Sequence, residues 1–186
     1  MLRLYLLRHA KSAWDDPGLD DHDRPLNARG RTAAALMGRH MAGLIACGDM
    51  DRPTVICSSA RRARETWKRV ARAGKLDWPV LEEPALYMAG TGSLVGILKA
   101  LPTELSSVML VGHNPGMQDL ALLLAGSGPQ AMRARLQRKL PTGSLLEIGF
   151  NLDRFARIAP SSGRLIRFDR PKGLMADTGL STSCDD

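Results

Sequence analysis

The chain has 186 residues, 44% of them hydrophobic, which suits one domain around a single core, and no apolar stretch is long enough to cross a bilayer. It carries 26 Lys and Arg residues against 19 Asp and Glu, and this net charge of +7 favours anionic partners. Only 4% of the residues are aromatic, which excludes a basic surface that stacks unpaired bases, and we expect a cytoplasmic protein that binds neither nucleic acid nor membranes.

Short apolar runs along the chain alternate with stretches of helical periodicity. The runs that predict buried strands are residues 4–7, 54–57, 108–111, 144–150 and 164–168. Apolar residues recur at helical spacing within residues 33–44, 63–71, 94–101 and 117–124. This alternation predicts an α/β fold, a three-layer α/β/α sandwich with a mostly parallel central sheet. We expect the domain to span residues 1–176 and residues 177–186, rich in Ser, Thr and Asp, to form a mobile tail.

Start and stop signals accompany the predicted helices. Asn27, Ser59 and Ser93 are predicted N-caps, because their side chains can accept hydrogen bonds from the free N–H groups of a first turn. Pro115 is expected at the first position of the fourth helix. Pro102 is expected to end the third helix, because proline cannot continue one.

Polar residues follow three of the predicted strands. Arg8 and His9 follow the first strand, Arg62 comes shortly after the second, and His113 and Asn114 follow the third. Ligands of open α/β sheets bind at the carboxyl edge of the strands, and helix N-termini there attract anions. Arginines and histidines at that edge therefore predict a pocket for phosphate or a similar anion.

Each of these residues also has a purely structural interpretation. His9 could satisfy a hydrogen bond at a strand end, and His113 could cap a helix. Arg62 could lie on a solvated helix face, since Arg61 and Arg64 are close to it in the sequence. Because such residues follow three different strands, the interpretation as an anion pocket is favoured over the structural one.

These residues lie in motifs that resemble the histidine phosphatase superfamily, the phosphoglycerate-mutase-like group. Residues 6–12 (LLRHAKS) resemble its nucleophile motif, residues 58–66 (SSARRARET) its second motif, and residues 111–116 (VGHNPG) its third. Residues 23–27 (DRPLN) with Gly30, and residues 139–143 (KLPTG), are similar to the small SixA-like phosphohistidine phosphatases. The resemblance extends from about residue 4 to about residue 168.

The resemblance implies a phosphoric hydrolase that forms a covalent intermediate. His9 would be the nucleophile and would be transiently phosphorylated before water releases phosphate. Phosphoryl oxygens would be held, and their charge neutralised, by Arg8, Arg62 and His113, with further substrate contacts from Ser12 and Asn114. No metal or organic cofactor is implied, and the three cysteines lack the spacing of metal ligands.

Two positions depart from the superfamily pattern. Ala10 stands where the superfamily most often has Gly. Met88 stands where relatives that act on phosphate monoesters commonly have a Glu proton donor, and methionine cannot donate a proton. The carboxylates that could substitute, although they are expected to be solvated, are Asp15, Asp16, Glu82 and Glu83.

The missing donor bears on the substrate. An alkoxide leaving group needs an acid, whereas an imidazole, with a reference pKa of about 6.5, can leave as a neutral ring once protonated. The predicted function is therefore a metal-independent phosphatase acting on phosphohistidine of a protein. A small-molecule phosphomonoesterase of the same superfamily and a non-catalytic phosphate-binding module are the alternatives. The basic segment from Arg133 to Lys139 is interpreted as a solubilising helix face, with docking of an acidic partner as the alternative.

Overall fold

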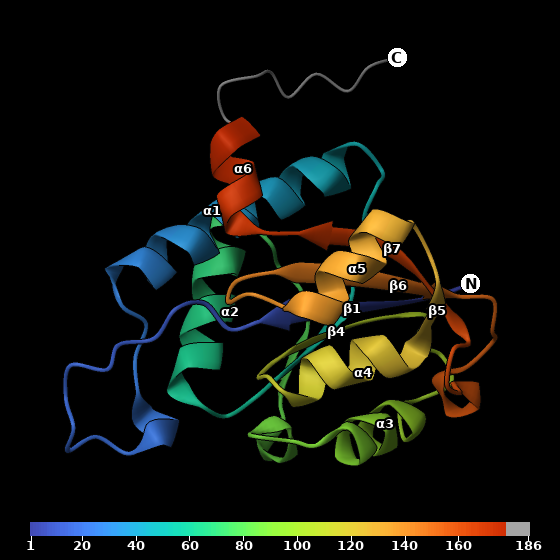
Figure 1. Cartoon of the computed structure of the whole chain (residues 1–186), viewed down its shortest axis with the longest axis horizontal. Coiled ribbons are helices and arrows are strands. Elements are labelled where there is room, and N and C mark those ends of the chain that lie inside the picture. The colour runs from blue at the N-terminus through green and yellow to red at the C-terminus, as the bar shows by residue number, and fades with distance from the viewer. Residues whose placement is uncertain (178–186) are drawn as a thin grey trace.

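In the computed structural model, which describes residues 1–177, helices cover both faces of one seven-stranded sheet (Figure 1). The strands are β1 (Leu2–Arg8), β2 (Thr54–Cys57), β3 (Val80–Glu82), β4 (Ser107–Gly112), β5 (Ala125–Ser127), β6 (Leu145–Phe150) and β7 (Gly163–Asp169). The α-helices are α1 (Ala28–Ala46), α2 (Arg61–Gly74), α3 (Thr91–Lys99), α4 (Gly116–Leu124), α5 (Gln130–Arg138) and α6 (Pro171–Asp177). Three 3-10 helices are η1 (Asp21–Asp23), η2 (Pro84–Leu86) and η3 (Phe155–Arg157).

The strand order is β3-β2-β4-β1-β6-β7-β5. Strands β3, β2, β4 and β1 run parallel to one another, β6 is antiparallel to β1 and β7, and β5 is parallel to β7. The predicted α/β fold with a mostly parallel sheet is confirmed. All five predicted strands are present, whereas β3 and β5 were not predicted. Each of these two edge strands has only three residues, too few for a run or an alternation to be visible in the sequence.

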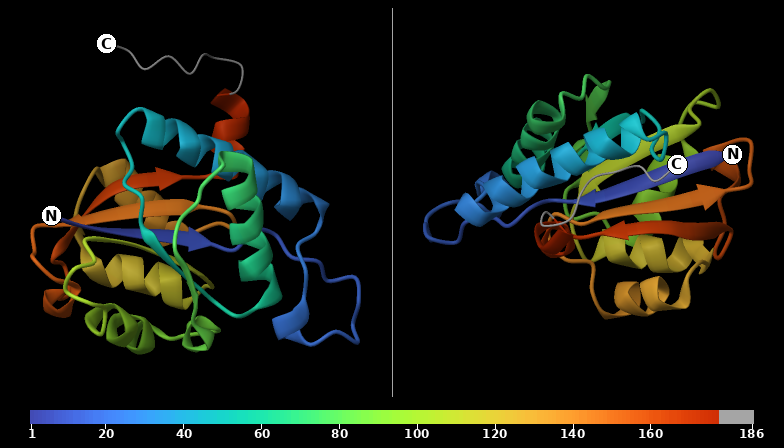
Figure 2. Two further views of the ribbon diagram at one scale, coloured as in Figure 1. Left: turned by 180° about the vertical axis from the view of Figure 1, so that it is seen from behind. Right: turned by 90° about the horizontal axis from the view of Figure 1, so that it is seen from above.

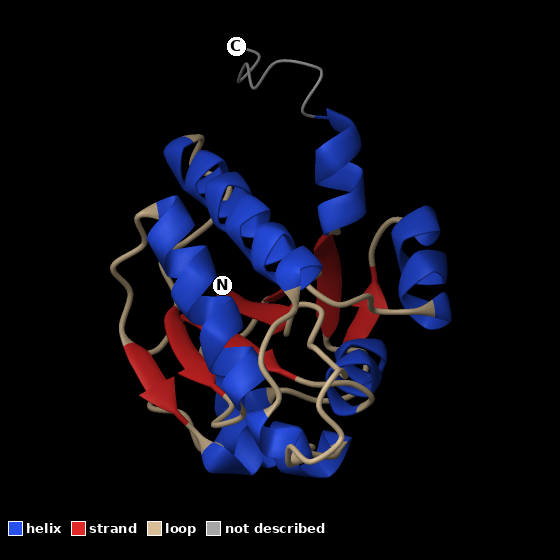
Figure 3. Ribbon diagram, turned by 90° about the vertical axis from the view of Figure 1, so that its left-hand side faces the viewer, coloured by secondary structure: helices blue, strands red, loops and turns tan. Residues whose placement is uncertain are grey.

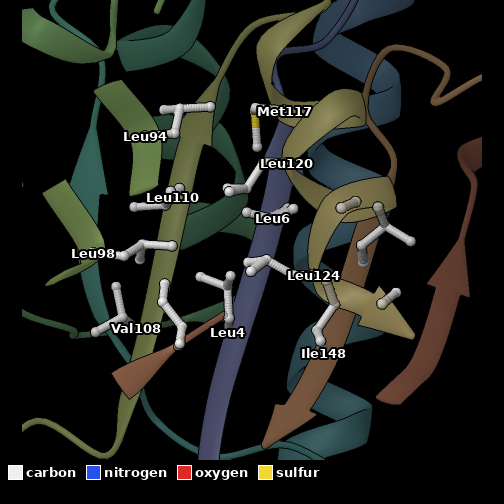
Figure 4. Packing of buried hydrophobic residues seen from close by; sticks show 14 of the residues in the cluster. Leu4, Leu6, Leu94, Leu98, Val108, Leu110, Met117, Leu120, Leu124 and Ile148 are labelled. Atoms are coloured by element: carbon white, nitrogen blue, oxygen red, sulfur yellow. The ribbon is translucent and has the colours of Figure 1, made fainter. Parts of the chain in front are cut away.

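Strand β1 is buried on both sides because it lies inside the sheet between two helical layers. Tyr5 and Leu7 pack in the core beneath α1 and α2, whereas Leu4 and Leu6 pack in the core beneath α3 and α4. Figure 2 shows α1 and the α4–α5 pair on opposite sides of the sheet, and Figure 4 shows how leucines of α3 and α4 meet β1 and β4. This double burial explains why β1 has a continuous apolar run.

The helix starts agree only in part with the predicted caps. Asn27 is the N-cap of α1, and its side chain accepts a hydrogen bond from the Gly30 N–H at 2.8 Å. The other two predicted caps are wrong: α2 is capped by Ala60 instead of Ser59, and α3 begins after Gly90, so that Ser93 lies within the helix. The observed N-caps, Ala60 and Gly90, make no side-chain hydrogen bond to the helix.

The remaining helix boundaries follow the prolines. Helix α3 ends at Lys99, before Pro102, and Pro115 directly precedes α4 as its N-cap, one position outside the expected one. No α-helix within residues 1–177 is long and apolar enough to span a membrane. Of the predicted tail, Asp177 ends α6 and the other residues lie outside the described part of the chain.

The start of α1 is pressed against the loop that follows β1. The Asn27 N–H donates to the Lys11 carbonyl at 3.0 Å, and a Cβ added at Gly30 would lie 2.0 Å from the same oxygen. Because this neighbour is backbone, no side-chain rotation can relieve such a clash. A glycine at position 30 therefore holds the loop that carries His9 close to α1.

Two alanine substitutions in α1 test this contact. Gly30→Ala is expected to lower the free energy of unfolding by about 1–3 kcal/mol through overpacking. Gly43→Ala, at a site with nothing within 4 Å of the added Cβ, is expected to raise it by about 0.5–1 kcal/mol because alanine favours a helix. Urea unfolding measures both. Equal shifts of the same sign would contradict the close packing of Gly30.

Candidate active site

Three neighbouring parallel strands end at the same edge of the sheet, and the predicted pocket residues follow them. Figure 3 views the molecule from the side on which β1 ends. His9 follows β1, His113 follows β4, and Arg62 is the second residue of α2, which begins shortly after β2. All three are buried, with exposed fractions of 8% or less, and the ring centroids of the two histidines are 5.1 Å apart. The structure thus brings these residues together.

Backbone contacts fix the orientation of the His9 ring. Its Nδ1 lies 2.7 Å from the Ala10 carbonyl oxygen, which can only accept a hydrogen bond, so Nδ1 carries the ring hydrogen. The lone pair of the neutral ring is therefore on Nε2. The Ala10 N–H donates to Thr66 Oγ1 at 2.9 Å, and this hydroxyl donates to the Arg62 carbonyl at 2.6 Å. These contacts attach the His9 loop to α2.

Burial among positive charges keeps both histidines neutral. Burial, together with the nearby charges of Arg62 and Arg8, lowers the pKa of His9 to about 4 against the opposing effect of the Ala10 carbonyl. The pKa of His113 is lowered to about 3, first by burial and then by His9 and Arg62. At neutral pH the His9 ring therefore keeps the lone pair that a nucleophile needs.

Two nitrogen atoms at the pocket, His113 Nδ1 and Arg8 Nε, are buried without a hydrogen-bond partner among the described residues. On the other edge of the His113 ring, Nε2 lies 2.8 Å from Ser58 Oγ. One terminal nitrogen of Arg8 donates to the Leu140 carbonyl at 2.6 Å. Buried polar atoms are normally paired, so these two atoms suit an oxyanion ligand.

Ser12 and Asn114, the other predicted substrate contacts, have protein partners. Ser12 is buried, and its hydroxyl accepts a hydrogen bond from Arg24 at 2.6 Å. The Asn114 amide donates to Gln118 at 3.0 Å and to the Leu140 carbonyl at 3.3 Å. Its Oδ1 atom is buried and unpaired among the described residues. Both side chains are therefore engaged by protein groups in this structure.

Sequence reasoning assigned no role to Asp21, which lies at the centre of a polar cluster. Its carboxylate accepts hydrogen bonds from Arg24 at 2.6 Å, from Arg62 at 2.9 Å and from the Tyr87 hydroxyl at 2.9 Å. Arg62 also donates to its backbone carbonyl. The Tyr87 ring meets the His113 ring edge-on, with centroids 5.6 Å apart. These contacts place Asp21 and Tyr87 beside the histidine pair.

A weak signal for two of these residues exists in the sequence. Arg24 lies within the DRPLN motif, and Tyr87 directly precedes the position of the missing donor. No local pattern points to Asp21, because its partners Arg62 and Tyr87 are 41 and 66 residues away in the chain. Arg24 also stacks on Trp14, with its guanidinium carbon 3.1 Å from the ring centroid.

Met88, at the position where relatives commonly have the Glu proton donor, lies on the surface. Met88 is 56% exposed, and its backbone has a φ of +51°. Among the candidate substitutes, Glu83 accepts from the Ala85 N–H, Glu82 pairs with Arg64 at 3.8 Å, and Asp16 accepts from the Gly18 N–H. None of these contacts involves a pocket residue.

The formal charges of the pocket suit a doubly charged oxyanion. Three arginines (Arg8, Arg24 and Arg62) and one carboxylate (Asp21) give 3 − 1 = +2, with both histidines neutral. Within residues 1–177, no group of three or more His, Cys, Asp or Glu side chains is arranged to hold a metal ion. The charges suit the binding of an anion beside the neutral ring of His9.

Comparisons with known proteins agree with this geometry. A profile of the histidine phosphatase superfamily (branch 1) matches residues 4–104. An uncharacterised protein of Mycobacterium tuberculosis is 34% identical over 168 residues, which cover 89% of this chain and 100% of that protein. The crystal structure of a candidate phosphohistidine phosphatase SixA from Agrobacterium tumefaciens has a TM-score of 0.73 and 32% identity over 91% of this chain and 98% of that chain.

The structure of a second candidate phosphohistidine phosphatase SixA, from Nakamurella multipartitia, has a TM-score of 0.73 and 26% identity over 91% of this chain and 96% of that chain. The family profile covers more than half of this chain, and the M. tuberculosis relative is matched along its whole length. The chain therefore belongs to the histidine phosphatase superfamily, which confirms the resemblance seen in the sequence and supports a phosphoric hydrolase activity.

Proposed function

We propose that the chain is a metal-independent phosphatase that removes the phosphoryl group from phosphohistidine on a protein through a phosphorylated His9. The observation that carries this proposal is the buried His9 ring, whose Nδ1 is bound to the Ala10 carbonyl and whose lowered pKa leaves Nε2 unprotonated beside three arginines. Membership of the superfamily supports the same chemistry.

The reaction proceeds in two steps. Nε2 of His9 attacks phosphorus, the bond from phosphorus to the substrate nitrogen breaks, and the phosphoryl group passes to His9. Arg8, Arg62 and His113 hold the phosphoryl oxygens and offset the negative charge that spreads over them. Water then attacks the phosphorylated His9, which releases phosphate and restores the free ring.

The chemistry of the leaving group favours phosphohistidine as the substrate. An alkyl phosphate needs a proton donor for its leaving oxygen, and Met88 supplies none. A protonated imidazole, whose reference pKa is about 6.5, leaves as a neutral ring without further help. The 32% identity with a candidate phosphohistidine phosphatase supports the same substrate class.

The protonation of His9 gives a first prediction for this mechanism. The imidazole signals of His9 in NMR spectra are expected to titrate near pH 4, the value to which burial and the neighbouring arginine charges lower its pKa. Above that pH the ring is neutral, so nucleophilic activity should be lost only as the pH falls through about 4. Arg62→Gln should move the titration to higher pH, because it removes a positive charge that opposes protonation. A wild-type midpoint near the ordinary value would contradict the burial argument.

Replacement of the nucleophile tests the activity itself. His9→Ala should lower phosphate release, measured without added metal, by roughly 1000-fold or more, because the covalent step is lost. His40→Ala is the matched control, because His40 contacts Asp169 and not the pocket, and it should retain activity. Wild type should also carry a covalent, acid-labile phosphate that His9→Ala lacks.

A choice of three substrates separates the substrate classes. The test uses a phosphohistidine protein, an aryl phosphate and a sugar phosphate. Faster turnover of sugar phosphates than of the phosphohistidine protein would show a small-molecule phosphomonoesterase. No turnover of any substrate, with phosphate still bound, would show a binding module.

A further inference from the structure

We propose that the Asp21 carboxylate contacts the leaving group of the reaction and accepts a hydrogen bond from the ring N–H of a protonated phosphoimidazole. Asp21 would then determine selectivity for phosphohistidine over phosphate esters. This inference rests on the proposed function, because it assigns a role to Asp21 in the same pocket. It goes further by naming the group that recognises the imidazole.

The position of Asp21 is that of a group just beyond the phosphoryl site. Its Oδ2 atom lies 2.9 Å from a terminal nitrogen of Arg62, the residue that is proposed to hold phosphoryl oxygens. The same oxygen accepts from Tyr87, whose ring stands against His113. The carboxylate is thus hydrogen-bonded to a guanidinium group that is proposed to hold the phosphoryl oxygens. Its side chain is 46% exposed, so a substrate ring can reach it from solvent.

The charged and titratable groups that face Asp21 keep it ionised. They are Arg24 from the end of η1, Arg62 from α2, Tyr87 from the loop after η2 and His113 from the end of β4. His22 packs against the Tyr87 ring, with centroids 4.9 Å apart. Burial acts to raise the pKa of Asp21, but the hydrogen bonds from Tyr87 and Arg62 and the positive charge of Arg62 outweigh it, and the pKa lies below its ordinary value. Asp21 therefore accepts hydrogen bonds at neutral pH and has no proton to donate.

A hydrogen-bond acceptor at this position favours a protonated imidazole over an ester oxygen as the leaving group. In the protonated substrate one ring nitrogen is bonded to phosphorus and the other carries a hydrogen. When the His9 Nε2–phosphorus bond forms, the phosphorus–nitrogen bond breaks, its electron pair goes to the ring, and a neutral imidazole leaves with its hydrogen. No proton from the enzyme is required, which is consistent with Met88 at the usual donor position. An ester oxygen instead gains negative charge, which a carboxylate repels.

The ratio of kcat/KM for phosphohistidine to that for an aryl phosphate isolates this contact. Asp21→Asn is expected to lower the ratio about tenfold or more, as for the loss of a hydrogen bond to a charged group. It should also move the alkaline limb of kcat for phosphohistidine to lower pH, because the bound, protonated ring loses its partner. Asp21→Glu, which keeps the charge, should restore part of the ratio. Asp16→Asn, on the same exposed loop, is the matched control.

Wild type provides a readout that needs no variant. The alkaline limb of kcat for phosphohistidine should lie at higher pH than the titration of the free substrate ring, followed by NMR, because kcat reports the bound ring. Coincidence of the two would overturn the inference. An equal fall for both substrates in Asp21→Asn would also overturn it, since Asp21 would then only orient Arg62, and the proposed function would stand. If wild type showed no preference for phosphohistidine, the proposed function itself would fail, and the inference with it.

Discussion

The hydrogen bond between His9 Nδ1 and the Ala10 carbonyl is the contact on which the proposed chemistry depends. It fixes the ring hydrogen on Nδ1, and so places the lone pair on Nε2. The bond holds only if residue 10 keeps its backbone in place, and the hydrogen bond from the Ala10 N–H to Thr66 does this. Arg62 is on the same helix as Thr66. One set of backbone contacts thus positions both the proposed nucleophile and an arginine that is proposed to bind phosphate.

The sheet imposes the next constraint. Because β2, β4 and β1 are parallel neighbours, the residues that follow them converge at one edge. The strands are buried on both faces, so polar side chains become possible only where they end. This is why Arg8, His9 and His113 could be predicted from the sequence: a continuous apolar run marks each strand, and the first polar residues after it mark the site. Their roles in catalysis stay predictions.

The part of the pocket that sequence reasoning missed is built differently. Asp21 lies in a 3-10 helix, and Tyr87 directly follows another, and neither element has a hydrophobic period that indicates its orientation. Their contact is tertiary and joins two loops. The edge strands β3 and β5 were missed for a related reason, since three residues are too few for a pattern. Regular elements were predictable, whereas short irregular segments were placed by contacts that the sequence does not display.

A carboxylate inside an anion pocket needs a physical reason, because it weakens the binding of phosphate. Asp21 is tolerated because Arg24 and Arg62 both donate hydrogen bonds to it. The same pairing lowers the positive charge that faces the substrate and the product. Three unopposed guanidinium groups would hold the released phosphate more tightly and slow its departure. Offsetting one of them with a carboxylate that also recognises the protonated ring of the substrate would favour turnover of phosphohistidine without a general acid at position 88.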